Sequence, residues 1–346
     1  MNTAAASTNH QIRLARRPVG LPTRADWSFT AEPVAQPEAE GVLVKTLALS
    51  LDPAMRGWMN EGKSYIAPVG IDEVMRAGGI GTVIASRNAK FAVGDRVSGA
   101  LGMQEYARFD NAQLAKSALV KIDLGIGTMT QWLNVLGMPG MTAYFGLLDV
   151  GQPKAGETVV VSGAAGAVGQ TVGQLAKVKG CRAVGIAGGP EKCRHVVEEL
   201  GFDAAIDYKA GDLAKALHQN CPDGIDVYFD NVGGEILDAT LAQIRRHARV
   251  VICGAISQYN AEGGMRGPSN YMSLLVNHAS MAGFVIFDYF DRLAEGGKEM
   301  GAWLAAGKLK SFEDIATGGI ERFPDTLLRL FKGENLGKLV LEVSSD

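Results

Sequence analysis

The stretch Thr158-Val159-Val160-Val161-Ser162-Gly163-Ala164-Ala165-Gly166-Ala167-Val168-Gly169 decides the fold of this chain. It begins with β-branched residues, passes into small residues and continues into a helical pattern. The three valines show no polar alternation, which is typical of a strand in a parallel sheet that is covered on both faces. The stretch therefore predicts a strand, a tight turn and the start of a helix.

The glycines of this stretch approximate the G-x-G-x-x-G pattern of dinucleotide-binding turns. Gly166 and Gly169 occupy its second and third glycine positions, and Ala164 stands at the first. A glycine at the second position lets the backbone approach a pyrophosphate, and the free N–H groups of the following helix favour an anion. Residues 170–178 continue an amphipathic helix, and residues 181–187 then read as a second strand. This context predicts a βαβ unit.

Strand and helix patterns alternate along the middle of the chain. This alternation predicts a doubly wound parallel sheet, in which ligands bind at the carboxyl ends of the strands. The expected strands are residues 204–208, 225–230 and 249–253, and the expected helices are residues 137–148, 191–200, 212–219 and 233–244.

The first 130 residues have a different character. Short β-like segments at 41–49, 81–86, 95–99 and 104–109 are separated by Gly, Asp, Asn and Pro, which favours a mostly antiparallel β domain. Beyond the parallel sheet we expect a helix at 291–306 and a final strand at 337–343 that returns to the first domain. The expected organisation is a catalytic domain (1–133), a dinucleotide-binding domain (134–290) and a carboxyl-terminal return (291–346).

Size and charge limit the classes of partner. At 346 residues the chain exceeds the usual size of a single core, so two domains are expected. The net charge of -3 provides no basic patch for nucleic acid and none for an anionic membrane. The expected partner is therefore a small molecule.

Cysteine usage and the amino-terminal residues indicate a cytoplasmic protein. The four cysteines (Cys181, Cys193, Cys221 and Cys253) have no C-x-x-C spacing and are expected to be reduced and mostly buried. Residues 1–20 lack the apolar region of a signal peptide. No stretch reaches the roughly 20 apolar residues of a membrane span.

The end of the second expected strand indicates which dinucleotide binds. Where an NAD-binding unit carries an acidic residue, this chain has Gly188 and Gly189, followed by Lys192. A nearby ammonium favours the 2′-phosphate of NADPH over a neutral hydroxyl. Two alternatives stay open: Lys192 and Arg194 form a solvated helix face, or Glu191 reaches a ribose 2′-hydroxyl.

Six segments in order carry a resemblance to a known family, namely residues 51–57, 136–144, 164–169, 230–234, 253–260 and 333–338. The chain resembles the zinc-independent medium-chain dehydrogenase/reductase superfamily, within its leukotriene B4 dehydrogenase / prostaglandin reductase branch, whose bacterial members include NADPH-dependent curcumin reductases. The resemblance implies a Rossmann doubly wound parallel sheet inserted in a GroES-like, mostly antiparallel β catalytic domain. It also implies a homodimer.

The resemblance further implies NADPH as cofactor and a set of site residues. The cofactor-binding residues would be Ala165, Gly166, Ala167, Val168 and Gly169 at the pyrophosphate, Gly188, Lys192 and Tyr208 at the 2′-phosphate ribose, and Asn231, Cys253, Gly254, Ala255, Ile256, Ser257, Phe284, Val285, Ile286 and Asn335 along the remainder. Met55, Arg56 and Met138 are expected to line the substrate pocket. An alternative for Asn335 is an ordinary turn residue.

No metal is expected in the first domain. A zinc site needs three or four Cys, His or carboxylate ligands, and this domain has one histidine, His10, and no cysteine. Without a metal, hydride transfer needs an acceptor that is already electrophilic. A carbon-carbon double bond conjugated to a carbonyl is such an acceptor, because donors can hold the enolate oxygen while the α carbon takes a proton.

Two tyrosines match the family's active-site positions. We expect Tyr259, with the ribose 2′-hydroxyl, to polarise the carbonyl, and Tyr65 to close the cleft and orient substrate or deliver the proton. The alternatives are a cofactor-packing residue for Tyr259 and an exposed loop aromatic for Tyr65. The expected activity is NADPH-dependent reduction of α,β-unsaturated aldehydes and ketones such as 2-alkenals, aryl enones and curcumin-like compounds. Two other functions stay open, a zinc-free quinone reductase and a non-catalytic NADPH-binding protein.

Overall fold

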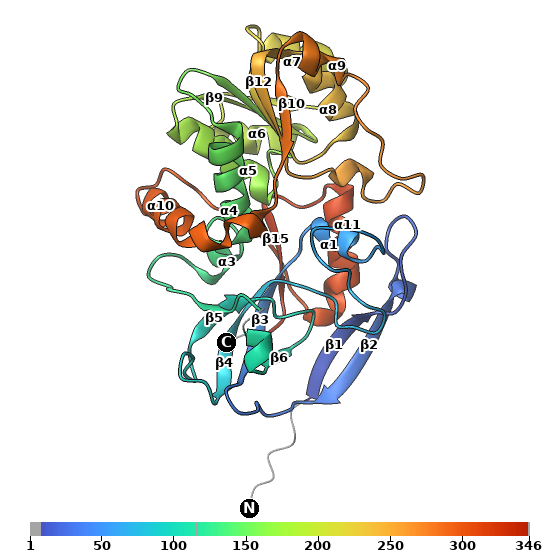
Figure 1. The fold of residues 1–346 in the computed structure, drawn as a ribbon, viewed down its shortest axis with the longest axis vertical. Coiled ribbons are helices and arrows are strands. Elements are labelled where there is room, and N and C mark those ends of the chain that lie inside the picture. The colour runs from blue at the N-terminus through green and yellow to red at the C-terminus, as the bar shows by residue number, and fades with distance from the viewer. Residues whose placement is uncertain (1–7, 115–116, 345–346) are drawn as a thin grey trace, which may run out of the picture. The chain divides into compact units, whose positions relative to one another are not determined.

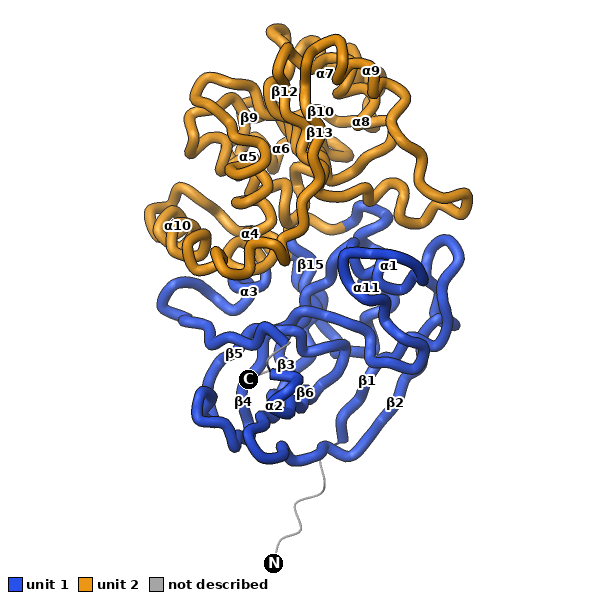
Figure 2. Tube along the Cα trace, in the orientation of Figure 1, with its two compact units in different colours: residues 1–133, 314–334, 338–346 blue, residues 134–313, 335–337 orange. Residues whose placement is uncertain are grey.

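The computed structural model describes residues 8–114 and 117–344, so part of the amino-terminal stretch considered above lies outside the described residues. The chain divides into two compact units (Figure 2). Unit 1 comprises Met1–Leu133, Asp314–Glu334 and Lys338–Asp346, and unit 2 comprises Asn134–Glu313 and Asn335–Gly337. The unit that carries the glycine-rich turn is therefore inserted in the sequence of the other.

Unit 2 is built on a six-stranded sheet with the order β10-β9-β8-β11-β12-β13. Figure 1 labels β9, β10 and β12 of this sheet. All of its strand pairs are parallel. In chain order this is the 3-2-1-4-5-6 arrangement of doubly wound dinucleotide folds, whose order reverses between β8 and β11. The strands are β8 (Thr158–Ser162), β9 (Arg182–Ala187), β10 (Ala204–Asp207), β11 (Ile225–Asp230), β12 (Ile244–Ile252) and β13 (Ser280–Gly283).

Helices connect these strands. Helix α5 follows β8 and buries Val172, Leu175 and Ala176, as its amphipathic pattern predicts. The helices of unit 2 are α4 (Met138–Phe145), α5 (Ala167–Val178), α6 (Pro190–Glu198), α7 (Leu213–Asn220), α8 (Gly234–Leu241), α9 (Met272–Val276) and α10 (Leu293–Ala305), with a π-helix η2 (Gly146–Gly151) and 3₁₀ turns η3 (Ile256–Gln258) and η4 (Ile286–Arg292).

Unit 1 contains a seven-stranded sheet of order β14-β15-β3-β4-β5-β7, with β6 paired to β3, and a separate hairpin of β1 and β2. Strand β3 pairs antiparallel with β4, β6 and β15. The elements are β1 (Thr8–Leu14), η1 (Arg24–Asp26), β2 (Trp27–Pro33), β3 (Val42–Ser50), α1 (Ala54–Trp58), β4 (Gly79–Ser86), β5 (Arg96–Gly99), β6 (Tyr106–Phe109), α2 (Asn111–Leu114), β7 (Val120–Lys121), α3 (Met129–Leu133), β14 (Glu313–Ala316), η5 (Ile320–Arg322), α11 (Phe323–Lys332) and β15 (Lys338–Glu342).

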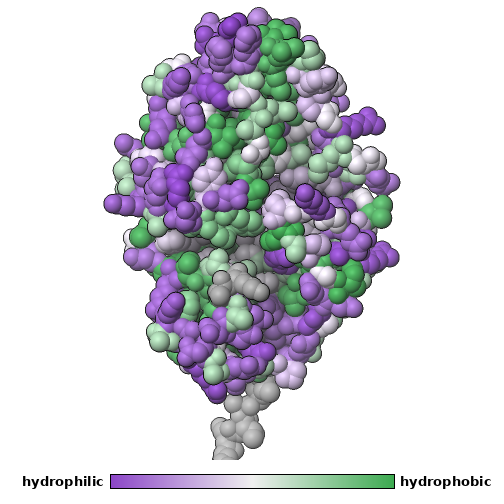
Figure 3. Space-filling view, in the orientation of Figure 1, coloured by the Kyte–Doolittle hydropathy of each residue, from purple (hydrophilic) through white to green (hydrophobic). Residues whose placement is uncertain are grey.

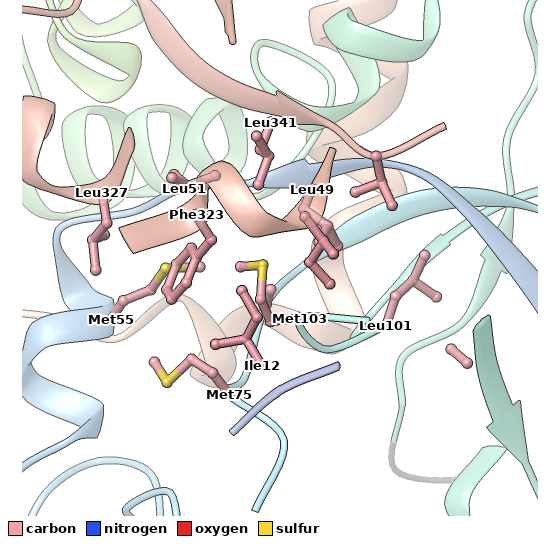
Figure 4. Packing of buried hydrophobic residues seen from close by; sticks show 14 of the residues in the cluster. Ile12, Leu49, Leu51, Met55, Met75, Leu101, Met103, Phe323, Leu327 and Leu341 are labelled. Carbon is pink, nitrogen blue, oxygen red and sulfur yellow. The ribbon is translucent and has the colours of Figure 1, made fainter. Parts of the chain in front are cut away.

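The core of unit 1 joins segments that are far apart in the sequence. Figure 4 shows Ile12 of β1, Met55 of α1, Leu49 of β3 and Phe323 of α11 gathered in one apolar cluster. Leu341 of β15 belongs to the same cluster, so the final strand completes this core.

The expected fold class is confirmed, with one change of organisation. The expected return at residue 291 is replaced by one at Asp314, because α10 packs against α4 inside unit 2. A Cβ at Gly296 would lie 3.0 Å from the sulfur of Met141, and the Tyr144 hydroxyl donates a hydrogen bond to Glu299 (3.0 Å). These contacts join α10 to α4 within unit 2.

Figure 3 shows charged and polar residues mixed with smaller apolar groups over one face of the molecule. Apolar side chains are exposed on α9, where Leu275 is 68% and Val276 is 72% exposed. No helix in the described part of the chain is both long enough and apolar enough to cross a membrane.

Candidate functional site

In the turn between β8 and α5, backbone atoms of several glycines lie close together. Gly163 has a φ of 62°, and its carbonyl oxygen accepts a hydrogen bond from the Gly166 N–H (2.9 Å). A Cβ at Gly169 would lie 2.2 Å from that same oxygen, so the helix can approach the turn only with glycine at this position. In the described structure α5 begins with no side-chain cap and no acidic residue in its first turn, so its N–H groups suit an anion.

Residues 335–337 of the carboxyl-terminal segment hold this turn in place through a backbone hydrogen bond. The Gly337 N–H donates a hydrogen bond to the Ala165 oxygen (2.8 Å). The Asn335 side chain is buried and donates to the Gly337 oxygen (2.9 Å). Asn335 therefore fixes the conformation of the segment whose Gly337 N–H bonds to the turn.

Gly188 and Gly189 follow β9 and form the next part of the site. A Cβ at Gly188 would lie 2.9 Å from the ring of Tyr208 and 3.0 Å from the Cε atom of Lys209. The Lys209 ammonium lies 5.8 Å from the centroid of the Tyr208 ring. Lys192 lies in the first half of α6, which begins directly after Gly189. The structure thus brings Lys209 to this place, a residue that the glycine pattern did not identify.

The acidic residue at the end of β10 is engaged with the backbone. The Oδ1 atom of Asp207 accepts hydrogen bonds from the Gly189 N–H (2.8 Å) and the Lys209 N–H (2.9 Å). Glu191 is exposed in the first turn of α6. The Asp207 carboxylate therefore holds the loop through backbone hydrogen bonds, and the Lys209 ammonium lies over the neighbouring Tyr208 ring.

Asn231 lies at the carboxyl edge of the sheet, directly after β11. Its amide donates to the Ser162 oxygen (2.8 Å), and its N–H donates to the Ser162 hydroxyl oxygen (2.9 Å). That hydroxyl donates to Asp230 (2.9 Å), which also accepts from the Tyr228 hydroxyl (2.8 Å). This buried network fixes the ends of β8 and β11, where the strand order reverses.

Residues 253–259 follow β12 at the same edge. The Cys253 N–H donates to the Asp230 oxygen (2.9 Å), and burial, with the charge of Asp230, raises the pKa of the Cys253 thiol to about 12. The thiol is therefore protonated at neutral pH. Gly254, Ala255, Ile256 and Ser257 continue this edge, and the 3₁₀ turn that they enter brings the chain to Tyr259.

Tyr259 follows the 3₁₀ turn η3, and β12 has already ended at Ile252. Its hydroxyl oxygen accepts a hydrogen bond from the Ala255 N–H (3.1 Å). A Cβ at Gly254 would lie 2.9 Å from this oxygen, so the phenol is held against the backbone. The turn therefore fixes the phenol at the carboxyl edge of the sheet.

Phe284, Val285 and Ile286 follow β13 and are half-buried. The ring of Phe284 packs inside unit 2, with its centroid 6.4 Å from that of Phe229, and it fills the space beside Gly146.

Two residues expected in a substrate pocket have structural roles instead. Met55 is wholly buried in the core of unit 1 (Figure 4). Arg56 is buried, and its guanidinium donates to the carbonyl oxygens of Gly20 (3.0 Å) and Pro18 (3.1 Å). Met55 and Arg56 therefore pack within unit 1 in this structure. Met138, the first residue of α4, is 42% exposed in unit 2.

Tyr65 belongs to unit 1 and lies in the loop after α1. Its side chain is 55% exposed, and its hydroxyl oxygen accepts a hydrogen bond from the Trp58 indole N–H (3.3 Å). Within residues 8–114 and 117–344, no three His, Cys, Asp or Glu side chains are grouped so that they could hold a metal ion.

Comparisons with known proteins show what this chain is similar to. A family model described as the N-terminal domain of oxidoreductase matches residues 10–117, and one described as zinc-binding dehydrogenase matches residues 167–300. The chain is 44% identical to the NADPH-dependent curcumin reductase of Escherichia coli (strain K12) over 347 residues, covering 98% of both chains. It is 40% identical to the NADP(+)-dependent 2-alkenal reductase of Nicotiana tabacum over 345 residues, again covering 98% of both.

A solved structure is also similar over the whole chain. The crystal structure of CurA in complex with NADPH from Vibrio vulnificus has a TM-score of 0.90 and 44% sequence identity, and the match covers 97% of this chain and 100% of that one.

Proposed function

This chain belongs to the zinc-independent medium-chain dehydrogenase/reductase family, and on that premise we propose that it is an NADPH-dependent ene reductase. Its substrates are α,β-unsaturated aldehydes and ketones, including 2-alkenals and curcumin-like aryl enones. The observation that supports this proposal is that the glycine turn of residues 163–169, Lys192, Lys209 and Tyr259 all follow the carboxyl ends of strands of one parallel sheet.

The residues of unit 2 fit the parts of the cofactor. The pyrophosphate would lie at residues 165–169, where a side chain at Gly169 would meet the Gly163 oxygen. Lys192, Tyr208 and Lys209 would hold the 2′-phosphate beside Gly188, and residues 253–257 with Asn231 would border the nicotinamide half. When bound, NADPH supplies the hydride that is added to the β carbon of the substrate.

Tyr259 is the proposed donor to the substrate carbonyl. Because the Ala255 N–H donates to its oxygen, the phenolic hydrogen takes no part in that bond. A phenol ordinarily stays protonated at neutral pH, so it can hydrogen-bond to the oxygen that becomes negative when the enolate forms. We assign Tyr259 this role.

Tyr65 is proposed to orient the substrate or to deliver the proton to the α carbon. Its oxygen also accepts a bond from a donor, the Trp58 indole N–H, and its side chain is more than half exposed. Both features suit a phenol that gives its hydrogen to a substrate atom.

The deciding experiment measures NADPH consumption with four groups of acceptor: 2-alkenals, aryl enones such as curcuminoids, 15-oxo-prostaglandin-like ketones and quinones. We expect turnover with enals or enones and recovery of the product with a saturated α,β bond. Faster turnover of quinones than of every enone would favour the quinone reductase. Tight NADPH binding without turnover of any acceptor would favour a non-catalytic binding protein.

We also propose that the chain forms a homodimer through the outer edge of its parallel sheet. Strand β13 is the last strand of the sheet and is exposed along its length, and an exposed edge strand is suited to pairing with a second chain. Exposed Leu275 and Val276 precede it. Sedimentation of the wild type and of Val276→Lys tests the pairing, with a monomeric wild type counting against it.

The proposed location is the cytoplasm. Cys181 and Cys221 are buried free thiols, and burial raises the pKa of each to about 11. Such thiols are usual in a reducing compartment. Fractionation of cells that express the chain tests this, and recovery from an extracytoplasmic fraction would contradict it.

A further inference from the structure

Three side chains of unit 1 form a small cluster around the exposed phenol. Trp58, the last residue of α1, donates its indole N–H to the Tyr65 oxygen (3.3 Å). The Arg76 guanidinium lies over the indole, with its Cζ atom 5.5 Å from the ring centroid. Trp58 therefore lies between a cation, Arg76, over its ring and a phenol, Tyr65, that accepts its N–H.

The fold of unit 1 holds Trp58 and Arg76 in place. The Trp58 ring packs against the core of unit 1, and its carbonyl oxygen accepts a hydrogen bond from the Val69 N–H (2.8 Å). Arg76 stands between Met75, whose N–H donates to Ile12 (2.9 Å), and Ala77, whose oxygen accepts from Gly102 (3.0 Å). Both side chains thus extend from backbone that long-range hydrogen bonds hold in place.

The charge of Arg76 is only partly compensated. Its Nη1 atom is buried and has no hydrogen-bond partner within the described structure. Burial lowers the pKa of this guanidinium, and the charges of Glu73 and Tyr65 act in the opposite direction. A cation in this position gains from any negative charge that forms nearby.

We propose that Trp58 and Arg76 are positioning residues that prepare Tyr65 to protonate the α carbon of the substrate. The inference rests on the proposed function. In this step the Tyr65 O–H bond breaks and its electron pair stays on the phenolic oxygen. The enolate electrons form the new C–H bond at the α carbon, and the carbonyl is restored. The Trp58 N–H and the Arg76 charge stabilise the phenolate until water returns a proton.

A double-mutant cycle tests this role. Trp58→Phe removes the indole N–H but keeps an aromatic ring, and Arg76→Met removes the charge. Each is expected to lower kcat about threefold to tenfold, the usual effect of one hydrogen bond or charge, with an unchanged KM for NADPH. In the Tyr65→Phe background the same changes should have less than about a twofold effect. A full effect in that background would overturn the proposal.

Matched variants separate this role from a general loss of packing. Trp132→Phe removes an indole N–H that donates to Asp123, also in unit 1, and Arg108→Met removes a surface cation paired with Glu38. Both should retain wild-type kcat. Arg76→Lys keeps the charge and should recover most of the activity that Arg76→Met loses. Equal losses in Arg76→Lys and Arg76→Met would count against an electrostatic role.

A measurement without substrate or cofactor tests the contact itself. Proton NMR follows the exchange of the Trp58 indole N–H with solvent, and the Trp58→Phe variant assigns its signal. The signal should exchange severalfold faster in Tyr65→Phe than in the wild type, because its acceptor is gone. Equal rates would show that the bond does not form, whether or not the protein reduces enones. Absence of turnover with protected exchange would instead count against the proposed function alone.

Discussion

The backbone N–H of Gly337 donates a hydrogen bond to the carbonyl oxygen of Ala165 (2.8 Å), which joins the carboxyl-terminal part of the chain to the turn that begins α5. The contact is close because Gly337 has no side chain: a Cβ there would lie 2.1 Å from the Phe312 oxygen. Phe312 in turn accepts a hydrogen bond from the buried Gln170 amide of α5 (3.2 Å). The proposed pyrophosphate turn is therefore held by a residue that lies far from it in the sequence.

Substitution of Gly337 by alanine should weaken both the fold and NADPH binding. The φ of 76° already disfavours alanine by about 1 kcal/mol, and the contact with Phe312 adds to this cost. We expect the free energy of unfolding to fall by more than about 2 kcal/mol and the Kd for NADPH to rise. Denaturant unfolding and fluorescence titration measure the two quantities.

Gly156→Ala is the matched control. Gly156 has a similar φ of 86°, but a Cβ there would have no neighbour within 4 Å. It should cost only the strain of about 1 kcal/mol and leave NADPH binding unchanged. If the two variants lose the same stability, the close approach at Gly337 is not important.

Replacement of Lys192 or Lys209 by alanine should weaken the preference for NADPH. Each ammonium is proposed to face the 2′-phosphate, and a charge-assisted hydrogen bond of this kind corresponds to about tenfold to a hundredfold in affinity. We expect kcat/KM with NADPH to fall by about that factor while kcat/KM with NADH stays the same. Steady-state kinetics with both cofactors measures the ratio.

Lys215→Ala serves as the control for these lysines. Lys215 is exposed on α7 and is not among the proposed phosphate contacts. Its replacement should leave the NADPH to NADH ratio as in the wild type. An equal fall for both cofactors in Lys209→Ala would mean that Lys209 supports the fold rather than the phosphate.

Tyr259→Phe should lower kcat/KM for enones by about a hundredfold, because the donor to the developing negative oxygen is lost. Tyr271→Phe, which removes an exposed phenol from the same unit, should behave as wild type. Steady-state kinetics with one enone decides. Unchanged kcat/KM in both Tyr259→Phe and Tyr65→Phe would remove these tyrosines from the mechanism.

Acid should selectively weaken the ion pair between Glu157 and Arg249. Burial by itself raises the pKa of Glu157, but hydrogen bonds from the Arg249 guanidinium and the Lys154 N–H outweigh it and lower the pKa. Because the folded-state pKa is depressed, the contribution to stability is complete above the unfolded pKa of about 4.3 and is lost as pH falls through the folded pKa.

Denaturant unfolding of the wild type and Glu157→Gln at about pH 7 and about pH 3 checks this, since these values bracket the ordinary glutamate pKa. The difference in stability between the two proteins should be larger at neutral pH than at acid pH. Glu198→Gln, an exposed change on α6, should show no such pH dependence of its difference from the wild type. A constant difference for Glu157→Gln would contradict the argument.

The sequence by itself determined the parallel sheet and the place of its glycine turn. Continuous apolar runs such as residues 159–161, followed by small residues and a helical pattern, are local signals that need no information from the rest of the chain. The same holds for β11 and for α5. Short-range patterns also placed Asn231 at the end of a strand, where it lies in the structure.

The tertiary structure alone decided which side chains meet. Met55 and Arg56 lie in residues 51–57, a segment that carries the family resemblance. Their burial depends on Ile12, Phe323 and the carbonyl oxygens of residues 18 and 20, which no local pattern places beside them. Lys209 reaches Gly188 only because β9 and β10 are neighbours in the sheet. The brace between Gly337 and Ala165 and the assignment of residues 291–313 to unit 2 likewise come from contacts between distant segments. Periodicity reports how a segment folds, whereas such contacts depend on how separate segments pack together.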